Sequence, residues 1–134
     1  MVSLTIDDRM LEVEEGKTIL DAARQTGISI PTLCWHESLS SAGSCRICVV
    51  EVVTNGKAEL TTACNYPVEA GLKVSTDSET VREARRLAVE LLLAQRPHST
   101  IMQELARKLG VEQLGFTLTQ KECILCQLCV RVCY

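Results

Sequence analysis

The order of apolar and polar positions predicts a small domain at the front of the chain. Residues 3–14 alternate in character on either side of Asp7-Asp8, which is typical of two short strands joined by a tight turn. From Thr18 to Gly27 the apolar residues recur at helical spacing instead, with Thr18 and Asp21 as a capping pair and Gly27 as a helix-ending residue. The chain should therefore begin as strand, strand and helix.

A second set of strands is predicted after a loop that is rich in serine and glycine. This loop, PTLCWHESLSSAGSCRIC, begins at Pro31 and leads into the apolar run ICVVEVV. Asn55-Gly56 is a specific hairpin signal that turns the chain into KAELTTAC, and GLKVST reads as one more short strand. Residues 1–77 are thus expected to form a small mixed sheet that holds one helix.

Helical spacing dominates the following residues, and we expect 78–115 to be a helical connector. Asp77-Ser78 can cap a helix that Pro97 ends, and a shorter helix is predicted from the capping pair Thr100 and Gln103 to Gly110. Each helix should present an apolar face to the first domain or to a partner. The expected apolar faces contain Val81, Ala84, Leu87, Ala88, Leu91, Leu92 and Gln95 in the first helix, and Ile101, Leu105 and Leu109 in the second. The expected water-facing residues of the first helix are Arg82, Arg85, Arg86 and Glu90.

Composition narrows the class of protein. Of the 134 residues, 46% are hydrophobic and 23% are charged, which is typical of a folded globular chain. Only 3% are aromatic and the net charge is -3, so the stacking platforms and basic stripe of a nucleic-acid binder are lacking. The first residues do not resemble a secretory signal, and the most apolar window, LAVELLLAQ, is too short to span a bilayer. We therefore expect a cytoplasmic protein without a transmembrane segment.

The eight cysteines need an explanation in such a compartment, because the cytoplasm keeps thiols reduced. Metal ligation accounts for them better than disulfides. The first group, Cys34, Cys45, Cys48 and Cys64, is separated by ten, two and fifteen residues. Plant-type ferredoxins likewise hold a [2Fe-2S] cluster with three cysteines from one loop and one distant cysteine. The small residues of the loop, Ala42, Gly43 and Ser44, would let backbone N–H groups approach the sulfur atoms.

The second group, Cys123, Cys126, Cys129 and Cys133, has gaps of two, two and three residues. This spacing is typical of the run that binds a [4Fe-4S] cluster in bacterial ferredoxins, where the fourth cysteine ligates the other cluster and precedes a proline. Here Tyr134 follows Cys133. Either Cys133 closes a single cluster, or it serves a second cluster in a chain that continues, which is the option we expect. Structural zinc is the alternative for both groups.

Three segments, IPTLCWHESLSSAGSCRICVVEV, VREARRLAVELLLAQRPH and CILCQLCVRVC, resemble iron-sulfur subunits of the complex I large-subunit type. That group includes the diaphorase small subunit of NAD-linked hydrogenases and the N-terminal parts of some [FeFe] hydrogenases and NAD-linked formate dehydrogenases. The resemblance implies an α+β fold. A β-grasp [2Fe-2S] ferredoxin domain would be followed by the helical connector and, over residues 116–134, by a bacterial-ferredoxin-like [4Fe-4S] segment.

The sequence departs from this group in one respect. Its members typically carry, after the long helix, a His-Pro followed by three cysteines that bind an additional four-iron cluster. Here Pro97 precedes His98, and no cysteine lies between Cys64 and Cys123. We therefore expect that cluster to be absent and His98 to be a surface residue. His36, two residues after Cys34, is either an ordinary loop histidine or an influence on the cluster potential.

The chain shows none of the residue patterns of an active site, such as a phosphate-binding loop or a dinucleotide fingerprint. Two clusters in one chain would instead form a relay for single electrons. The resemblance implies two partners, a flavoprotein that oxidises NAD(P)H and a subunit acting on hydrogen, formate or another low-potential couple. Two alternatives remain open: the chain is the N-terminal portion of the catalytic hydrogenase or formate dehydrogenase polypeptide, or it is a zinc-stabilised structural module.

Overall fold

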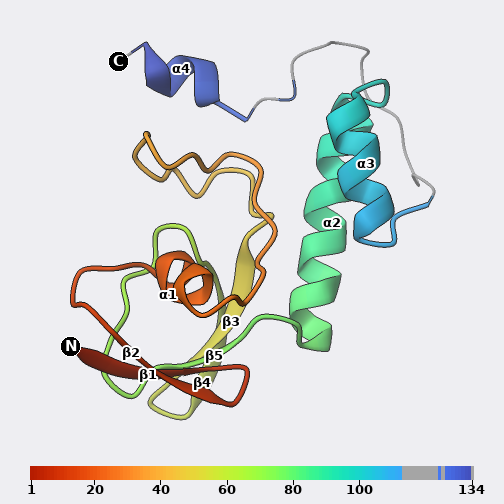
Figure 1. Ribbon diagram of the computed structural model, residues 1–134. Coiled ribbons are helices and arrows are strands. Elements are labelled where there is room, and N and C mark those ends of the chain that lie inside the picture. Colours follow the sequence, from red (N-terminus) through yellow and green to blue (C-terminus); the bar gives the residue numbers. More distant parts are fainter. Residues whose placement is uncertain (113–123, 125, 134) are drawn as a thin grey trace.

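The computed structural model describes residues 1–112, 124 and 126–133. Its front part is a mixed five-stranded sheet in the order β2-β1-β5-β3-β4 (Figure 1). The strands are β1 (Val2–Ile6), β2 (Arg9–Val13), β3 (Val49–Thr54), β4 (Lys57–Thr62) and β5 (Lys73–Ser75). Central β1 and β5 are parallel, and the remaining neighbours are antiparallel. The expected combination of α and β elements is thereby confirmed.

Both predicted hairpins are present, and their turns explain the residues found there. Asp7 and Asp8 have φ values of 47° and 64°, and Asn55 and Gly56 have values of 51° and 77°. Two successive residues with positive φ give the turn whose twist matches paired strands, and Asp, Asn and Gly tolerate that conformation best.

The helix α1 (Ile19–Gln25) packs its apolar face into the core of the sheet. Its start is fixed by the expected capping box, in which Thr18 N donates to Asp21 Oδ2 at 3.0 Å and Asp21 N donates to Thr18 Oγ1 at 3.2 Å. Beyond the cap, Leu20 N donates to Ala63 O at 2.9 Å. This bond ties the first turn of α1 to the residue before Cys64.

Two further helices, α2 (Glu79–Gln95) and α3 (Thr100–Lys108), lie side by side against the end of the sheet (Figure 1). Val89 of α2 and Ala106 of α3 form an apolar cluster with Ile47, with Leu33 and Cys45 packed against it. The apolar faces of the connector helices therefore contact the cysteine loop of the first domain and cover it.

The buried face of α2 differs from the predicted one. Leu87 and Leu91 are 55% and 44% exposed, whereas Arg85, expected to face water, is only 6% exposed. The buried arc runs through Val81, Arg85 and Val89 at steps of four residues. The prediction counted only apolar side chains, so the predicted face is about one residue away from the observed one. Arg85 is buried because its guanidinium donates hydrogen bonds inside the protein.

The start and the outer face of α3 also need correction. Ser99, not Thr100, caps the helix, because its side chain accepts a hydrogen bond from Met102 N. Ile101 is 59% exposed, and Met102 and Ala106 are the residues that α3 buries.

The last described element is the short helix α4 (Leu128–Val132). Arg131 reaches from it to the cysteine loop, where Nη1 donates to Ser40 O at 2.6 Å and Nη2 donates to Cys34 O. In Figure 1 this helix accordingly lies over the loop that follows α1. None of the helices in the described ranges combines the length and apolarity needed to cross a bilayer.

Candidate metal centre

Four cysteine thiols lie together at one end of the sheet, although the first and the last are 30 residues apart in the sequence. Cys34, Cys45 and Cys48 belong to the loop between α1 and β3, and Cys64 follows β4. Cys34, Cys48 and Cys64 are 1–2% exposed, and Cys45 is partly exposed. All four are free thiols. The structure thus brings together the complete first group of predicted site residues.

The four thiols are arranged as two pairs. Cys45 lies beside Cys34 and Cys48 lies beside Cys64, so that the two side chains of each pair interact directly. Across the described residues, no three His, Cys, Asp or Glu side chains converge closely enough to hold one metal ion. A two-iron cluster requires four thiolates, two on each iron, and two thiol pairs match that number of donors.

Within each pair, the interaction between the two thiols lowers the pKa of one and raises the pKa of the other. The interaction with the Cys45 thiol, helped by the backbone and hydroxyl of Ser44, lowers the pKa of Cys34 to about 4 despite its burial. The corresponding interaction with Cys48 lowers the pKa of Cys64. The same interactions, together with burial, raise the pKa of Cys45 and of Cys48. Within the pairs, Cys34 and Cys64 are therefore the thiols whose pKa the partner lowers, which favours loss of their protons to a metal.

Backbone N–H groups of the loop point at the sulfur atoms, as expected from its small residues. Gly43 donates to Cys64, Ser44 donates to Cys34, and Ile47 N lies 3.4 Å from Cys45 Sγ. Gly43 has φ of 64°, and a Cβ there would lie 2.6 Å from Asn65 Nδ2. Only glycine fits this close approach without a shift of Asn65, whose side chain is held by Thr62.

Neighbouring residues fix the loop without joining the thiol pairs. The Arg24 guanidinium stacks 3.9 Å from the ring centroid of Trp35, next to Cys34. His36 is exposed, and its Nδ1 accepts a hydrogen bond from Ser38 N at 3.2 Å. His98 is exposed at the turn between α2 and α3, as predicted.

The second predicted group is only partly described. Cys123 lies outside the described residues. Cys126 is half-buried, and Cys129 and Cys133 are exposed, in and next to α4. The described cysteines of this group do not converge on a common point.

Two arginines that contact the cysteine loop were missed by sequence reasoning. Arg85 donates to the carbonyls of Ile47 and Val49, and Arg131 donates to the carbonyl of Cys34. For Arg85 a signal existed, because it lies four residues from both Val81 and Val89 and so shares their helix face. Nothing in the sequence distinguishes Arg131 from a surface arginine.

Comparison with known proteins identifies the family of the domain that contains the thiol pairs. Residues 1–79 match the model of the 2Fe-2S iron-sulfur cluster binding domain. The chain belongs to this family. The matched residues include both thiol pairs and the whole five-stranded sheet.

Larger proteins contain similar stretches. The NADPH-Fe(3+) oxidoreductase subunit alpha of Geobacter sulfurreducens is 38% identical over 157 residues, covering 98% of this chain and 18% of that protein. The mitochondrial NADH-ubiquinone oxidoreductase 78 kDa subunit of Candida albicans is 41% identical over 96 residues, covering 72% of this chain and 13% of that protein. This chain thus spans less than a fifth of the length of either relative.

A solved structure shows the same fold over nearly the whole chain. A chain of the NAD+-reducing [NiFe]-hydrogenase in its H2-reduced state has a TM-score of 0.83 and 33% identity, covering 97% of this chain and 64% of that one. The predicted resemblance to the complex I and NAD-linked hydrogenase group is confirmed by these matches.

Proposed function

We propose that this chain is an electron-transfer module that carries a [2Fe-2S] cluster on Cys34, Cys45, Cys48 and Cys64. The single observation that carries the proposal is the arrangement of these thiols as two pairs, with three of the four thiols buried and backbone N–H groups directed at the sulfur atoms. In this assignment Cys34 and Cys45 hold one iron, and Cys48 and Cys64 hold the other. The strand order β2-β1-β5-β3-β4 around α1 supports the β-grasp interpretation of residues 1–77.

The residues of the site explain how electrons pass without a reaction on the polypeptide. A bound cluster supplies a one-electron couple. The chain provides four thiolates, N–H groups that stabilise added negative charge on sulfur, and an apolar cover from α1, α2 and α3 that excludes water. Cys45 is more exposed than the other three, so in this proposal electrons exchange with a partner on the side of the loop around Cys45.

A second cluster, [4Fe-4S], is proposed on Cys123, Cys126, Cys129 and Cys133, with Cys133 either closing it or serving another cluster. The proposal rests on the cysteine spacing. Contacts between α4 and the cysteine loop support it further, because they would keep the two clusters of a relay close together. In this division residues 78–115 form the connector and 116–134 form the second cluster segment.

The molecular context is proposed by analogy with the relatives. Their names describe enzymes that use NADPH, NADH or NAD+. We propose that this module connects an NAD(P)H-oxidising flavoprotein to a site for hydrogen, formate or a similar low-potential couple, in the cytoplasm. Because the relatives are much longer, the same module can equally form the front of a catalytic polypeptide.

Anaerobic metal and sulfide analysis with EPR spectroscopy tests the proposal. The expected result is iron with acid-labile sulfide, about six irons per chain when both clusters are bound. Two irons with only a [2Fe-2S] signal would refute the second cluster alone. Zinc without sulfide would refute the whole proposal and establish the structural-module alternative.

A further inference from the structure

At the start of β3, two buried carbonyl groups on the side facing β5 have no partner strand among the described residues. Pairing between β3 and β5 stops at Glu51 and Ser75. The carbonyls of Val49 and Ile47 lie further along the same edge of the chain, since residues two apart in an extended segment point the same way. Buried carbonyls of this kind need donors.

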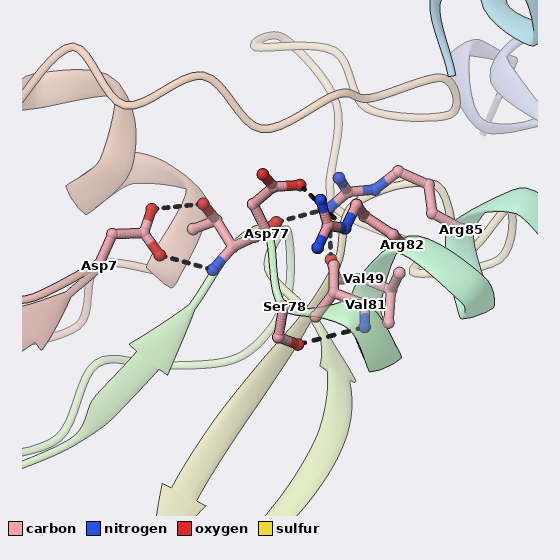
Figure 2. A network of polar contacts seen from close by, with 8 residues as sticks. Asp7, Val49, Asp77, Ser78, Val81, Arg82 and Arg85 are labelled. Carbon is pink, nitrogen blue, oxygen red and sulfur yellow. Dashed lines mark hydrogen bonds and ion pairs between the residues drawn. The ribbon is translucent and has the colours of Figure 1, made fainter. Parts of the chain in front are cut away.

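Arg85 of α2 supplies these donors. Its Nε donates to Ile47 O at 3.0 Å, and its Nη2 donates to Val49 O at 2.7 Å and to Thr76 O at 3.3 Å. Figure 2 shows the guanidinium held between Val49 and the segment leading into α2. The position of that segment is fixed in turn by Asp7, whose carboxylate accepts from both Thr76 N and Thr76 Oγ1.

The guanidinium is a buried charge without a paired carboxylate among the described residues. Arg85 is 6% exposed, and Asp77 makes its ion pair at 4.0 Å with Arg82 instead. Burial lowers the pKa of Arg85, and the nearby Asp77 and Cys48 act in the opposite direction. An arginine remains protonated across the range in which the protein works. The Arg85 guanidinium therefore carries a full positive charge in the protein interior, where solvent screens it poorly.

This charge lies close to the thiol pairs. The Ile47 carbonyl that accepts from Arg85 belongs to the peptide unit that continues into Cys48, and the N–H of the same residue lies against Cys45 Sγ. One residue thus connects the guanidinium with one member of each thiol pair. Arg85 also lies beyond residues 1–79, the part of the chain that matches the domain family.

We propose that Arg85 is a positioning residue for the [2Fe-2S] site, whose buried positive charge favours the reduced cluster and so raises its reduction potential. The inference rests on the proposed function. Reduction adds one electron, supplied in the test by dithionite, and converts one of two ferric ions to ferrous. The cluster with its four thiolates then carries one more negative charge, which a nearby fixed cation stabilises.

Potentiometric titration of the cluster-loaded protein, followed by the EPR signal of the reduced [2Fe-2S] cluster, tests this role. Arg85→Met is expected to shift the one-electron equilibrium about tenfold towards the oxidised form, a potential lower by about 59 mV. Arg85→Lys, which keeps the charge, should retain most of the wild-type potential. Arg82→Met is the matched control, because it removes a charge from the solvent-facing side of the same helix and should leave the potential unchanged.

Several outcomes would overturn the inference. One is an Arg85→Met protein that retains its cluster and has the same potential as Arg82→Met. Another is an Arg85→Lys protein whose potential falls as far as that of Arg85→Met. If Arg85→Met does not fold, Arg85→Gln keeps a hydrogen-bond donor without the charge, and a wild-type potential in that variant contradicts the role of the charge. A wild-type protein that binds no [2Fe-2S] cluster instead refutes the proposed function.

Discussion

At the scale of single residues, Cys45 is the best of the four thiols for testing the assignment of the first cluster. It is partly exposed, whereas the other three are buried, so serine can replace it without burying an unpartnered hydroxyl. Cys45→Ser should abolish the [2Fe-2S] EPR signal because it removes a ligand of one iron, while the [4Fe-4S] signal persists. Cys129→Ser, in α4, is the matched control and should have the opposite effect. Loss of both signals in either variant would contradict the division into two separate sites.

Gly43 offers a second test, in which conformational strain can be separated from a steric clash. An alanine at this position carries the cost of a positive φ, about 1–2 kcal/mol, and places its Cβ 2.6 Å from Asn65 Nδ2. If the backbone of residue 43 shifts to relieve this contact, its own N–H, which donates to Cys64, shifts with it. Gly43→Ala should therefore lose its cluster faster in the presence of a chelator, measured by the decay of visible absorbance.

Gly56→Ala is the control for this change. Its φ of 77° imposes the same strain, but nothing lies within 4 Å of the added Cβ. Cluster loss at the wild-type rate is expected for Gly56→Ala. Equal acceleration in the two variants would mean that strain alone, and not contact with Asn65, explains the effect at Gly43.

At the scale of elements, the capping box of α1 connects helix stability to the site. Thr18→Ala removes the side-chain acceptor for Asp21 N and should lower the free energy of unfolding by about 1 kcal/mol, measured by urea denaturation. Thr18→Ser keeps the hydroxyl and should cost clearly less. If serine destabilised the protein as much as alanine, the methyl group of Thr18 and not the cap would be the important feature.

The elements show which parts of the fold the sequence could predict. Local signals predicted both hairpin turns, the cap of α1 and the end of α2 before Pro97, since each depends on residues a few positions apart. The buried face of α2 was predicted wrongly, because Arg85 is buried by the distant carbonyls of Ile47 and Val49. A pattern that counts apolar residues has no access to such partners.

The sequence could predict that the first four cysteines form one group but not how they are arranged, and their role as cluster ligands stays a prediction. Spacing identified Cys34, Cys45, Cys48 and Cys64 as one group. Their division into two pairs depends on how the loop folds over Cys64, which the bond between Ala63 N and Cys48 O at 3.0 Å helps to fix. Such contacts arise only from the folded sheet.

At the scale of the whole molecule, α4 is connected to the first domain through a contact spanning almost the entire chain. Arg131 donates to the carbonyls of Ser40 and Cys34, 91 and 97 residues away. Its Nε is buried without a partner among the described residues, so the two terminal nitrogens make the described hydrogen bonds of the Arg131 side chain. These bonds connect the segment that contains Cys129 and Cys133, on either side of Arg131, to the loop of the first thiol group.

Arg131→Ala should consequently increase the distance between the two proposed clusters. Spin–spin interaction between two reduced clusters falls steeply with their separation, so the EPR spectrum of the fully reduced protein should lose broadening relative to wild type. Removing hydrogen bonds from a charged donor also weakens the docking of α4, by about 1.5–3 kcal/mol for each bond lost. Arg107→Ala, on the exposed side of α3, is the control and should leave the spectrum unchanged. An Arg131→Ala protein that holds both clusters and shows wild-type broadening would mean that other contacts fix α4, and that Arg131 only caps two carbonyls of the loop.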